Sequence, residues 1–181
     1  MQSQNPHIIY TIGHSTRSME DFLALLKEFG IELLVDIRRF PGSKKYPWFD
    51  KENLEKELQE NGIIYIHMES LGGRRKVQPD SPNDRWRNDS FRGYADYMET
   101  DEFKTAVRKL EDTASEKTTA YMCSEAVWWS CHRSMISDYL KAAGWKVHHI
   151  MNHGKTEEHP YTSAARIVDG QVCYSDENLF S

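Results

Sequence analysis

The sequence has no apolar run that approaches the roughly 20 residues needed to span a bilayer. Its first ten residues, MQSQNPHIIY, lack the basic start and the apolar stretch of a secretory signal peptide. An excess of positive charge is missing as well, because 23 Lys and Arg residues stand against 28 Asp and Glu residues. These absences predict a cytoplasmic protein with no membrane partner. The net charge of −5 also excludes a simple polycation that coats nucleic acid.

Cysteine is scarce, with only Cys123, Cys131 and Cys173 in the chain. An odd count without a secretory signal predicts reduced thiols and not a disulfide framework. The three residues do not form the CxxC knuckle of a structural zinc site, and HExxH, GxGxxG and Walker patterns are absent. The sequence therefore predicts no metal site and assigns no cofactor.

What the sequence does contain is a regular alternation of apolar and helical segments. Five short apolar runs are expected to be strands: 7–13, 31–37, 63–68, 118–124 and 145–151. Periodic patterns predict helices at 18–29, 50–61, 91–114 with a break near Thr100, and 131–143. This alternation is typical of βαβ crossovers, and nearly continuous apolar strands are typical of a sheet covered on both faces. We therefore predict an α/β fold: a mostly parallel five-stranded sheet with helices on both faces.

Two segments depart from this alternation. Residues 165–174 place Asp-Gly between two apolar runs, which predicts a short C-terminal antiparallel hairpin at the edge of the sheet. Residues 69–90 contain two glycines, two prolines and many charges without hydrophobic periodicity, and a connection of this length is usually functional or disordered. We expect residues 1–181 to form a single α/β domain that contains this long basic loop.

Reactive side chains follow the ends of all five predicted strands. The residues at these positions are His14, Ser15, Asp36, Arg38, Arg39, His67, Glu69, Arg74, Arg75, Cys123, Ser124, Glu125, His149, Asn152 and His153. In an open parallel sheet the carboxyl ends of the strands lie along one rim, and ligands bind in the crevice outside them. The sequence therefore predicts one composite site at this rim, although polar residues after a strand also serve ordinary turns and helix caps.

The segment 123–133, CSEAVWWSCHR, carries the sharpest local signal. Cys123 ends a strand, while Cys131, His132 and Arg133 begin a helix. Backbone N–H groups at a helix start, together with a nearby cation, favour the thiolate form of cysteine. The pattern fits a reactive thiol at Cys123, and it also fits a small buried side chain, which is the usual role of a free cysteine. The spacing differs from the CxxxxxR loop of cysteine phosphatases, because Arg133 lies ten residues beyond Cys123.

Charge is unevenly distributed along the chain. Residues 36–45 and 73–92 each carry a net charge of +3, whereas residues 50–60 carry −3. Aromatic residues accompany the basic segments, namely Trp48, Phe49, Trp86 and Phe91. Cations beside flat rings suit a nucleotide or an unpaired base. A solvated basic loop with its aromatic side chains packed underneath is an equally good interpretation.

Taken together, the motifs TIGHST, VDIRRFPGS, LGGRR, FRGYADYM and MCSE…CHR, followed by HHI, resemble the domain-of-unknown-function family 488. The resemblance covers nearly the whole chain in order and implies a small α/β domain, but it implies no particular reaction. The positions that carry it are His14, Ser15, Asp36, Arg38, Pro41, Ser43, Gly72, Arg74, Arg92, Gly93, Tyr94, Cys123, Glu125, Cys131, His132 and Arg133. Seven of these residues also belong to the predicted rim: His14, Ser15, Asp36, Arg38, Arg74, Cys123 and Glu125.

The leading hypothesis is an intracellular enzyme, a hydrolase or transferase, that acts on a small anionic, phosphate-bearing, nucleotide-like substrate. The predicted catalytic residues are Cys123 as the nucleophile, with Asp36, Glu125, His14 and His132. The predicted substrate-binding residues are Ser15, Arg38, Arg74, Arg92, Tyr94, Cys131 and Arg133. One alternative is a nucleic-acid-binding module that uses the basic, aromatic-rich segment 69–92. Another is a thiol-based regulatory protein that works through Cys123 and Cys131.

Overall fold

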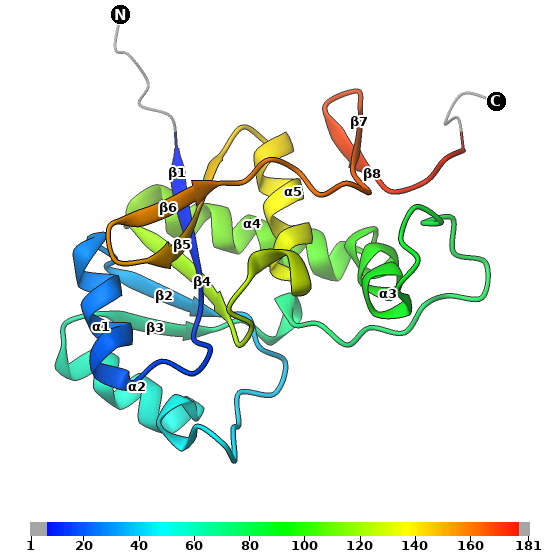
Figure 1. The fold of residues 1–181 in the computed structure, drawn as a ribbon. Helices are drawn as coiled ribbons and strands as arrows, with labels where there is room; N and C mark the ends of the chain where they lie inside the picture. Colours follow the sequence, from blue (N-terminus) through cyan, green and yellow to red (C-terminus); the bar gives the residue numbers. More distant parts are fainter. Residues whose placement is uncertain (1–6, 178–181) are drawn as a thin grey trace, which may run out of the picture.

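A computed structural model describes residues 7–177 and places a six-stranded sheet at the centre of the molecule (Figure 1). The strands are β1 (Ile8–Gly13), β2 (Leu33–Asp36), β3 (Ile64–His67), β4 (Thr119–Cys123), β5 (Lys146–Asn152) and β6 (Lys155–Glu158). Their order across the sheet is β3-β2-β4-β1-β5-β6, and all pairings among β1 to β5 are parallel. The predicted α/β class and mostly parallel sheet are confirmed.

Helices cover both faces of the sheet, as predicted. The α-helices of the described part are α1 (Met19–Glu28), α2 (Lys51–Glu60), α3 (Asp89–Met98), α4 (Asp101–Glu116) and α5 (Arg133–Ala142), and the 3-10 turns are η1 (Pro47–Phe49), η2 (Glu69–Leu71) and η3 (Trp128–Ser130). One core cluster joins α1 and α2 to the sheet through residues such as Phe22 and Leu54. The other joins α3, α4 and α5 to it through residues such as Phe103 and Ile136. None of the helices within residues 7–177 has the length and apolar character needed to cross a membrane.

The sheet has one more strand than the sequence predicted. Strand β6 pairs antiparallel with β5 after a turn at Gly154, whose φ of +68° suits glycine. Its sequence, KTEE, is polar and mostly exposed, so it has no apolar run by which it could be recognised.

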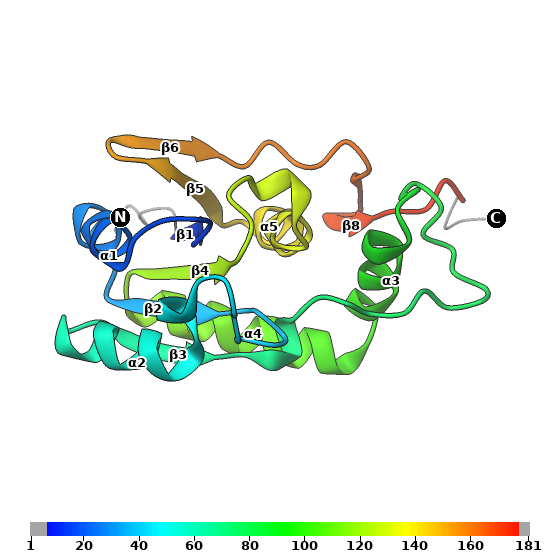
Figure 2. The ribbon, with the colours of Figure 1, turned by 60° about the horizontal axis from the view of Figure 1, so that its bottom comes forward.

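The predicted C-terminal hairpin exists, but its expected place at the sheet edge is wrong. It consists of β7 (Arg166–Val168) and β8 (Gln171–Cys173), which form a separate two-stranded sheet. The turn residues Asp169 and Gly170 both have positive φ, as an Asp-Gly hairpin turn requires. Figures 1 and 2 show this hairpin and α3 on the same side of the molecule, beyond α5. The edge of the main sheet beside β5 is already occupied by β6.

The break expected near Thr100 separates α3 from α4. The Thr100 hydroxyl caps α4 by accepting the N–H of Phe103 at 3.3 Å. The buried Asp96 of α3 holds the preceding segment, since its carboxylate accepts hydrogen bonds from Gln78 N–H, Ser81 Oγ and Asn83 Nδ2. The long connection at 69–90 is therefore tied to α3 by specific hydrogen bonds.

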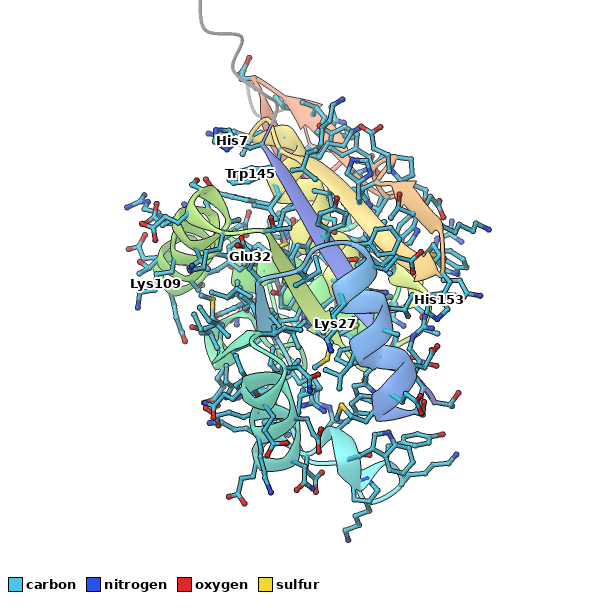
Figure 3. The ribbon with its side chains drawn as sticks, turned by 90° about the vertical axis from the view of Figure 1, so that its left-hand side faces the viewer. His7, Lys27, Glu32, Lys109, Trp145 and His153 are labelled. Atoms are coloured by element: carbon cyan, nitrogen blue, oxygen red, sulfur yellow. The ribbon has the colours of Figure 1, made fainter. Side chains whose placement is uncertain are left out.

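The turn between β5 and β6, where Figure 3 labels His153, contacts α1 through the side chain of His153 and through the N–H of Gly154, which donates to Glu28. His153 lies 2.7 Å from Asp21 Oδ1 through Nε2 and 2.9 Å from Glu28 Oε2 through Nδ1. Hydrogen bonds to Asp21 and then to Glu28 raise the pKa of His153 above its usual value of 6.5. The imidazolium form thus stabilises the folded chain, fully at pH values below 6.5, and this contribution disappears as the pH rises through the folded-state pKa.

We predict that His153→Gln lowers the melting temperature more at about pH 5.5 than at about pH 8.5. At the lower pH the wild-type imidazolium faces two carboxylates, and at the higher pH a larger fraction of it is neutral. Thermal melts of both proteins at the two pH values measure the difference. An equal effect at both pH values would contradict a charged contact. His148→Gln is the matched control, because His148 lies in β5, just before the turn that carries His153, and forms no ion pair among the described residues.

Candidate functional site

A cavity of about 800 Å³ opens at the carboxyl ends of β1, β2 and β4. Nine of the twelve residues predicted for the site line it: His14, Ser15, Arg38, Arg74, Tyr94, Cys123, Glu125, Cys131 and His132. The parallel register explains why they meet, since Gly13 of β1 pairs with Cys123 of β4. Beyond the strands, the N–H of His14 bonds to the carbonyl of Cys123 and the N–H of Ser15 to that of Ser124, each at 3.0 Å.

Glycine is required at position 13, where the end of β1 approaches the segment after β4. A Cβ atom added to Gly13 would lie 1.7 Å from the carbonyl oxygen of Glu125. Two residues on the cavity wall also have strained backbones, because Ser15 and Arg74 have φ values of +51° and +60°. Such left-handed conformations cost roughly 1–3 kcal/mol each and often mark functional sites.

Asp36, one of the predicted catalytic residues, lies beneath the cavity and not on its surface. Its side chain is fully buried and accepts hydrogen bonds from Arg38 Nε at 2.9 Å, Arg38 Nη2 at 2.8 Å and the Tyr65 hydroxyl at 2.6 Å. Arg38 also donates to the carbonyl of Phe49. Through these hydrogen bonds Asp36 holds the side chain of Arg38 in the cavity wall.

Arg92, predicted to bind substrate, does not line the cavity either. Its guanidinium donates to the carbonyl oxygen of Ser81 at 2.7 Å and to Ser81 Oγ at 3.2 Å. The helix that contains Arg92, α3, lies so close to the 69–90 segment that a Cβ atom on Gly93 would be 2.1 Å from the carbonyl oxygen of Arg75. Through these hydrogen bonds Arg92 holds the segment 69–90 against α3.

Arg133 is the third predicted residue that lies away from the cavity surface. It is 1% exposed and forms no ion pair with any residue in 7–177. Its Nη2 donates to the carbonyl oxygens of Glu125 and Ala126, at 3.3 and 3.5 Å, while Nε and Nη1 have no partner there. A buried cation without a carboxylate is costly unless another anion lies nearby.

The thiolate of Cys123 is the anion whose charge interacts with that of Arg133. Cys131 Sγ donates to Cys123 Sγ at 2.7 Å. Burial by itself raises the pKa of Cys123, but the hydrogen bond from Cys131 and then the charge of Arg133 outweigh it and lower the pKa to about 7. Burial, followed by the contact with Cys123, instead raises the pKa of Cys131 well above its usual value. Because this pKa is about 7, about half of the molecules carry one negative charge on the pair at pH 7, and Cys123 holds it.

The two histidines of the cavity are neutral at neutral pH. Burial is the main reason that the pKa of His14 and that of His132 each fall to about 4. His14 Nδ1 lies 3.0 Å from the carbonyl of Ser15, so Nδ1 carries the proton and Nε2, 3.5 Å from Arg38 Nη1, holds the lone pair. His132 Nδ1 lies 3.6 Å from Cys131 Sγ. The Cys123 thiolate thus depends on Arg133 and Cys131 and needs no imidazolium.

The mouth of the cavity is basic, and the predicted site residues covered only part of it. The lining also includes Arg39, Phe40, Lys45 and Tyr46 from the segment after β2. Arg39, Lys45 and Arg74 form no ion pair within residues 7–177. Arg39 is one of the residues predicted at the rim, and the net charge of +3 over residues 36–45 was the signal that could have added Lys45 to the site.

An exposed aromatic ring accompanies these cations. Phe40 is 61% exposed, and the guanidinium carbons of Arg39 and Arg74 lie 5.5 and 5.7 Å from its ring centre. Asn88, Ser90 and Phe91 complete the lining from the start of α3. No group of three or more His, Cys, Asp or Glu residues in the described part of the chain has the arrangement of a metal site.

Comparisons with known proteins give one match. The model of the family described as Domain of unknown function DUF488 matches residues 18–140, which is more than half of the 181-residue chain. No curated protein and no solved structure matches the chain.

Proposed function

This chain belongs to the DUF488 family, and we propose that it is an enzyme, a hydrolase or transferase, whose Cys123 thiolate attacks a small phosphate-bearing substrate. The observation that carries the proposal is the buried Arg133, which has no carboxylate partner and whose charge lowers the pKa of Cys123. A thiolate at neutral pH is a strong nucleophile, and this one lies on the wall of a cavity with a basic mouth.

The three cations at the mouth would hold the substrate anion. Arg39, Lys45 and Arg74 have no competing carboxylate, so a phosphate group would supply their counter-charge. Phe40 offers an exposed ring on which the flat base of a nucleotide can stack. A nucleotide derivative is therefore the substrate class that fits the lining best.

The reaction would proceed through a covalent cysteinyl intermediate. Cys123 Sγ forms a bond to phosphorus as the bond from phosphorus to the leaving oxygen breaks. Water at the open cavity would protonate that oxygen. Water or an acceptor hydroxyl then attacks phosphorus and the S–P bond breaks. The carboxylate of Glu125, whose exposed side chain lines the cavity beside Cys123, would take the proton of the attacking group. The neutral His14 and His132 shape the cavity in this scheme.

We predict that Cys123→Ser abolishes turnover of any nucleotide substrate found in a screen of phosphate mono- and diesters. Because serine is not deprotonated at neutral pH, the loss is expected to be at least about 1,000-fold in kcat. Wild-type protein quenched in acid during turnover should carry a phosphoryl adduct of about 80 Da, located on Cys123 by peptide mass spectrometry. Cys173→Ser is the matched control and should behave as wild type, since Cys173 lies in the C-terminal hairpin. Turnover that survives in Cys123→Ser would remove the proposal.

The nucleic-acid-binding alternative draws less support from the segment 69–92. Arg75, Arg85 and Arg92 each donate to backbone carbonyl oxygens of the protein itself, and Arg85 also pairs with Asp176. Within residues 7–177, these contacts leave Arg74, Lys76 and Arg87 as the cations of the segment that form neither such a hydrogen bond nor an ion pair. Too few phosphate contacts remain for the steep salt dependence of a dedicated nucleic-acid-binding surface.

A further inference from the structure

The two sulfur atoms of the cavity are closer to each other than to any other reactive group. Cys131 Sγ lies 2.7 Å from Cys123 Sγ, and the two residues are eight positions apart in the sequence. Both residues line the cavity, but their side chains are only 2% and 6% exposed, so a solute that reaches the sulfur atoms has to be small. Cys173, the remaining cysteine, instead donates its thiol to the carbonyl oxygen of Ser175 at 3.7 Å.

We infer that Cys123 and Cys131 are a site of reversible oxidation, at which a hydroperoxide oxidises Cys123 and Cys131 then closes an intramolecular disulfide. The sulfur contact carries the inference, because the thiol that must displace the oxidised group already points at it. Arg133 supports the first step from behind the pair, since it favours the thiolate that attacks the peroxide.

The environments of the two thiols assign their roles. Cys123 carries the negative charge of the pair, and Cys131 keeps its proton, which it donates to Cys123. The N–H of Arg133 donates to Cys131 Sγ at 3.4 Å and by itself lowers the pKa of Cys131, but burial and the contact with Cys123 outweigh it. Cys123 is therefore the thiol that meets the peroxide, and Cys131 is the thiol that resolves the product.

The chemistry balances with hydrogen peroxide as the oxidant. The Cys123 thiolate attacks one peroxide oxygen, the O–O bond breaks, and the products are a sulfenic acid on Cys123 and hydroxide. Cys131 Sγ then bonds to Cys123 Sγ, and the sulfenic hydroxyl leaves as water with the Cys131 proton. Two electrons pass from the two sulfurs to the peroxide, and a thiol reductant reverses the change by thiol–disulfide exchange.

Closure of this disulfide would switch the enzyme off. In the disulfide Cys123 is no longer a thiolate and is too weak a nucleophile to attack phosphorus, and Arg133 loses its anionic neighbour. This consequence rests on the proposed function, whereas the oxidation itself does not. The disulfide would also protect Cys123 from irreversible oxidation to the sulfinic acid.

The test treats the reduced full-length chain with a small molar excess of hydrogen peroxide and maps the cysteines by mass spectrometry without reduction. We expect the intact mass to fall by about 2 Da, a single crosslink between the peptides of Cys123 and Cys131, and full reversal by dithiothreitol. Alkylation should then find only Cys173 free in the oxidised chain. A Cys123 that stays reduced, or that passes to the sulfinic acid in the wild-type chain without forming the crosslink, would overturn the inference.

Two variants separate the roles of the thiols. In Cys131→Ser the crosslink is lost and Cys123 should gain about 32 Da as the sulfinic acid, because no thiol intercepts the sulfenic acid. Cys173→Ser should form the same crosslink as wild type. Retention of a crosslink to Cys123 in Cys131→Ser would contradict the assigned roles.

Failure of the inference and failure of the proposed function give different results. The mass measurement needs no substrate, so a chain that forms the disulfide but turns over no phosphate ester keeps the inference and loses the proposed function. A chain that turns over substrate through Cys123 but forms no disulfide keeps the proposed function and loses the inference.

Discussion

Replacing Arg133 by Met is expected to slow alkylation of Cys123 at neutral pH by about 10- to 50-fold, because the thiolate loses its neighbouring positive charge. In the wild-type chain the rate of reaction with iodoacetamide should rise with pH through a midpoint near 7. In Arg133→Met that midpoint should move up towards the value of an ordinary thiol, about 8.5 or higher. The rate is measured over a pH series with the alkylated residue identified by peptide mapping.

Arg133→Lys is the matched control, because it keeps a positive charge on the same residue of α5. It should retain a midpoint closer to that of wild type than Arg133→Met does. The unbranched Met side chain fills a similar buried space, and near-ultraviolet circular dichroism shows whether each variant keeps its packing. If Arg133→Met leaves the midpoint near 7, the hydrogen bond from Cys131 alone accounts for the low pKa of Cys123, and Arg133 has no part in the nucleophile.

The burial of Arg133 was within reach of sequence reasoning, although its position in the site was interpreted as substrate binding. Arg133 precedes Ile136 by three residues and Leu140 by seven, and positions with this spacing share one face of a helix. Because Ile136 and Leu140 form the buried stripe of α5, the same stripe directs Arg133 inward. The position of Arg133 at the start of an apolar helical stripe is the signal that it is buried. Arg74 has no such position, because it lies exposed on a loop.

The fold could be predicted to the extent that burial leaves a pattern in the sequence. Strands β1 to β5 are apolar because helices cover both of their faces, so their existence and parallel direction followed from hydrophobic runs. Strand β6 lies at an open edge with exposed side chains, and hydrogen bonding to β5 alone defines it. The carboxyl ends of β1, β2 and β4 meet at one cavity for the same reason, whereas the residues predicted at the end of β5 do not line it.

The contacts within the cavity could not be predicted, because they depend on loop conformation. The 2.7 Å approach of Cys131 to Cys123 requires the turn η3 to fold the chain back, and the spacing of the two cysteines does not specify that path. Trp128 fixes the turn by stacking on His149 at 4.9 Å with an interplanar angle of 8°. This aromatic contact joins residues that are far apart in sequence and carry no shared motif.

Replacing Asp36 by Ala is expected to lower the free energy of unfolding by about 3–5 kcal/mol, because it leaves the buried guanidinium of Arg38 without its carboxylate. Arg38 is 7% exposed and holds Asp36 through two of its nitrogens, and the Tyr65 hydroxyl would lose its acceptor as well. Urea denaturation followed by tryptophan fluorescence measures the change.

The double variant Asp36→Ala with Arg38→Met gives this prediction its control, since removing both charges together should cost less than removing Asp36 alone. The same experiment separates a positioning residue from a catalytic one. If Asp36 transferred a proton to substrate, Asp36→Asn would lose turnover while remaining about as stable as wild type. If it holds Arg38 in the cavity wall, Asp36→Asn should lose stability and substrate affinity together, since an amide cannot accept both guanidinium hydrogen bonds and the tyrosine hydroxyl as a carboxylate does. A loss of stability below about 1 kcal/mol in Asp36→Ala would contradict the positioning role.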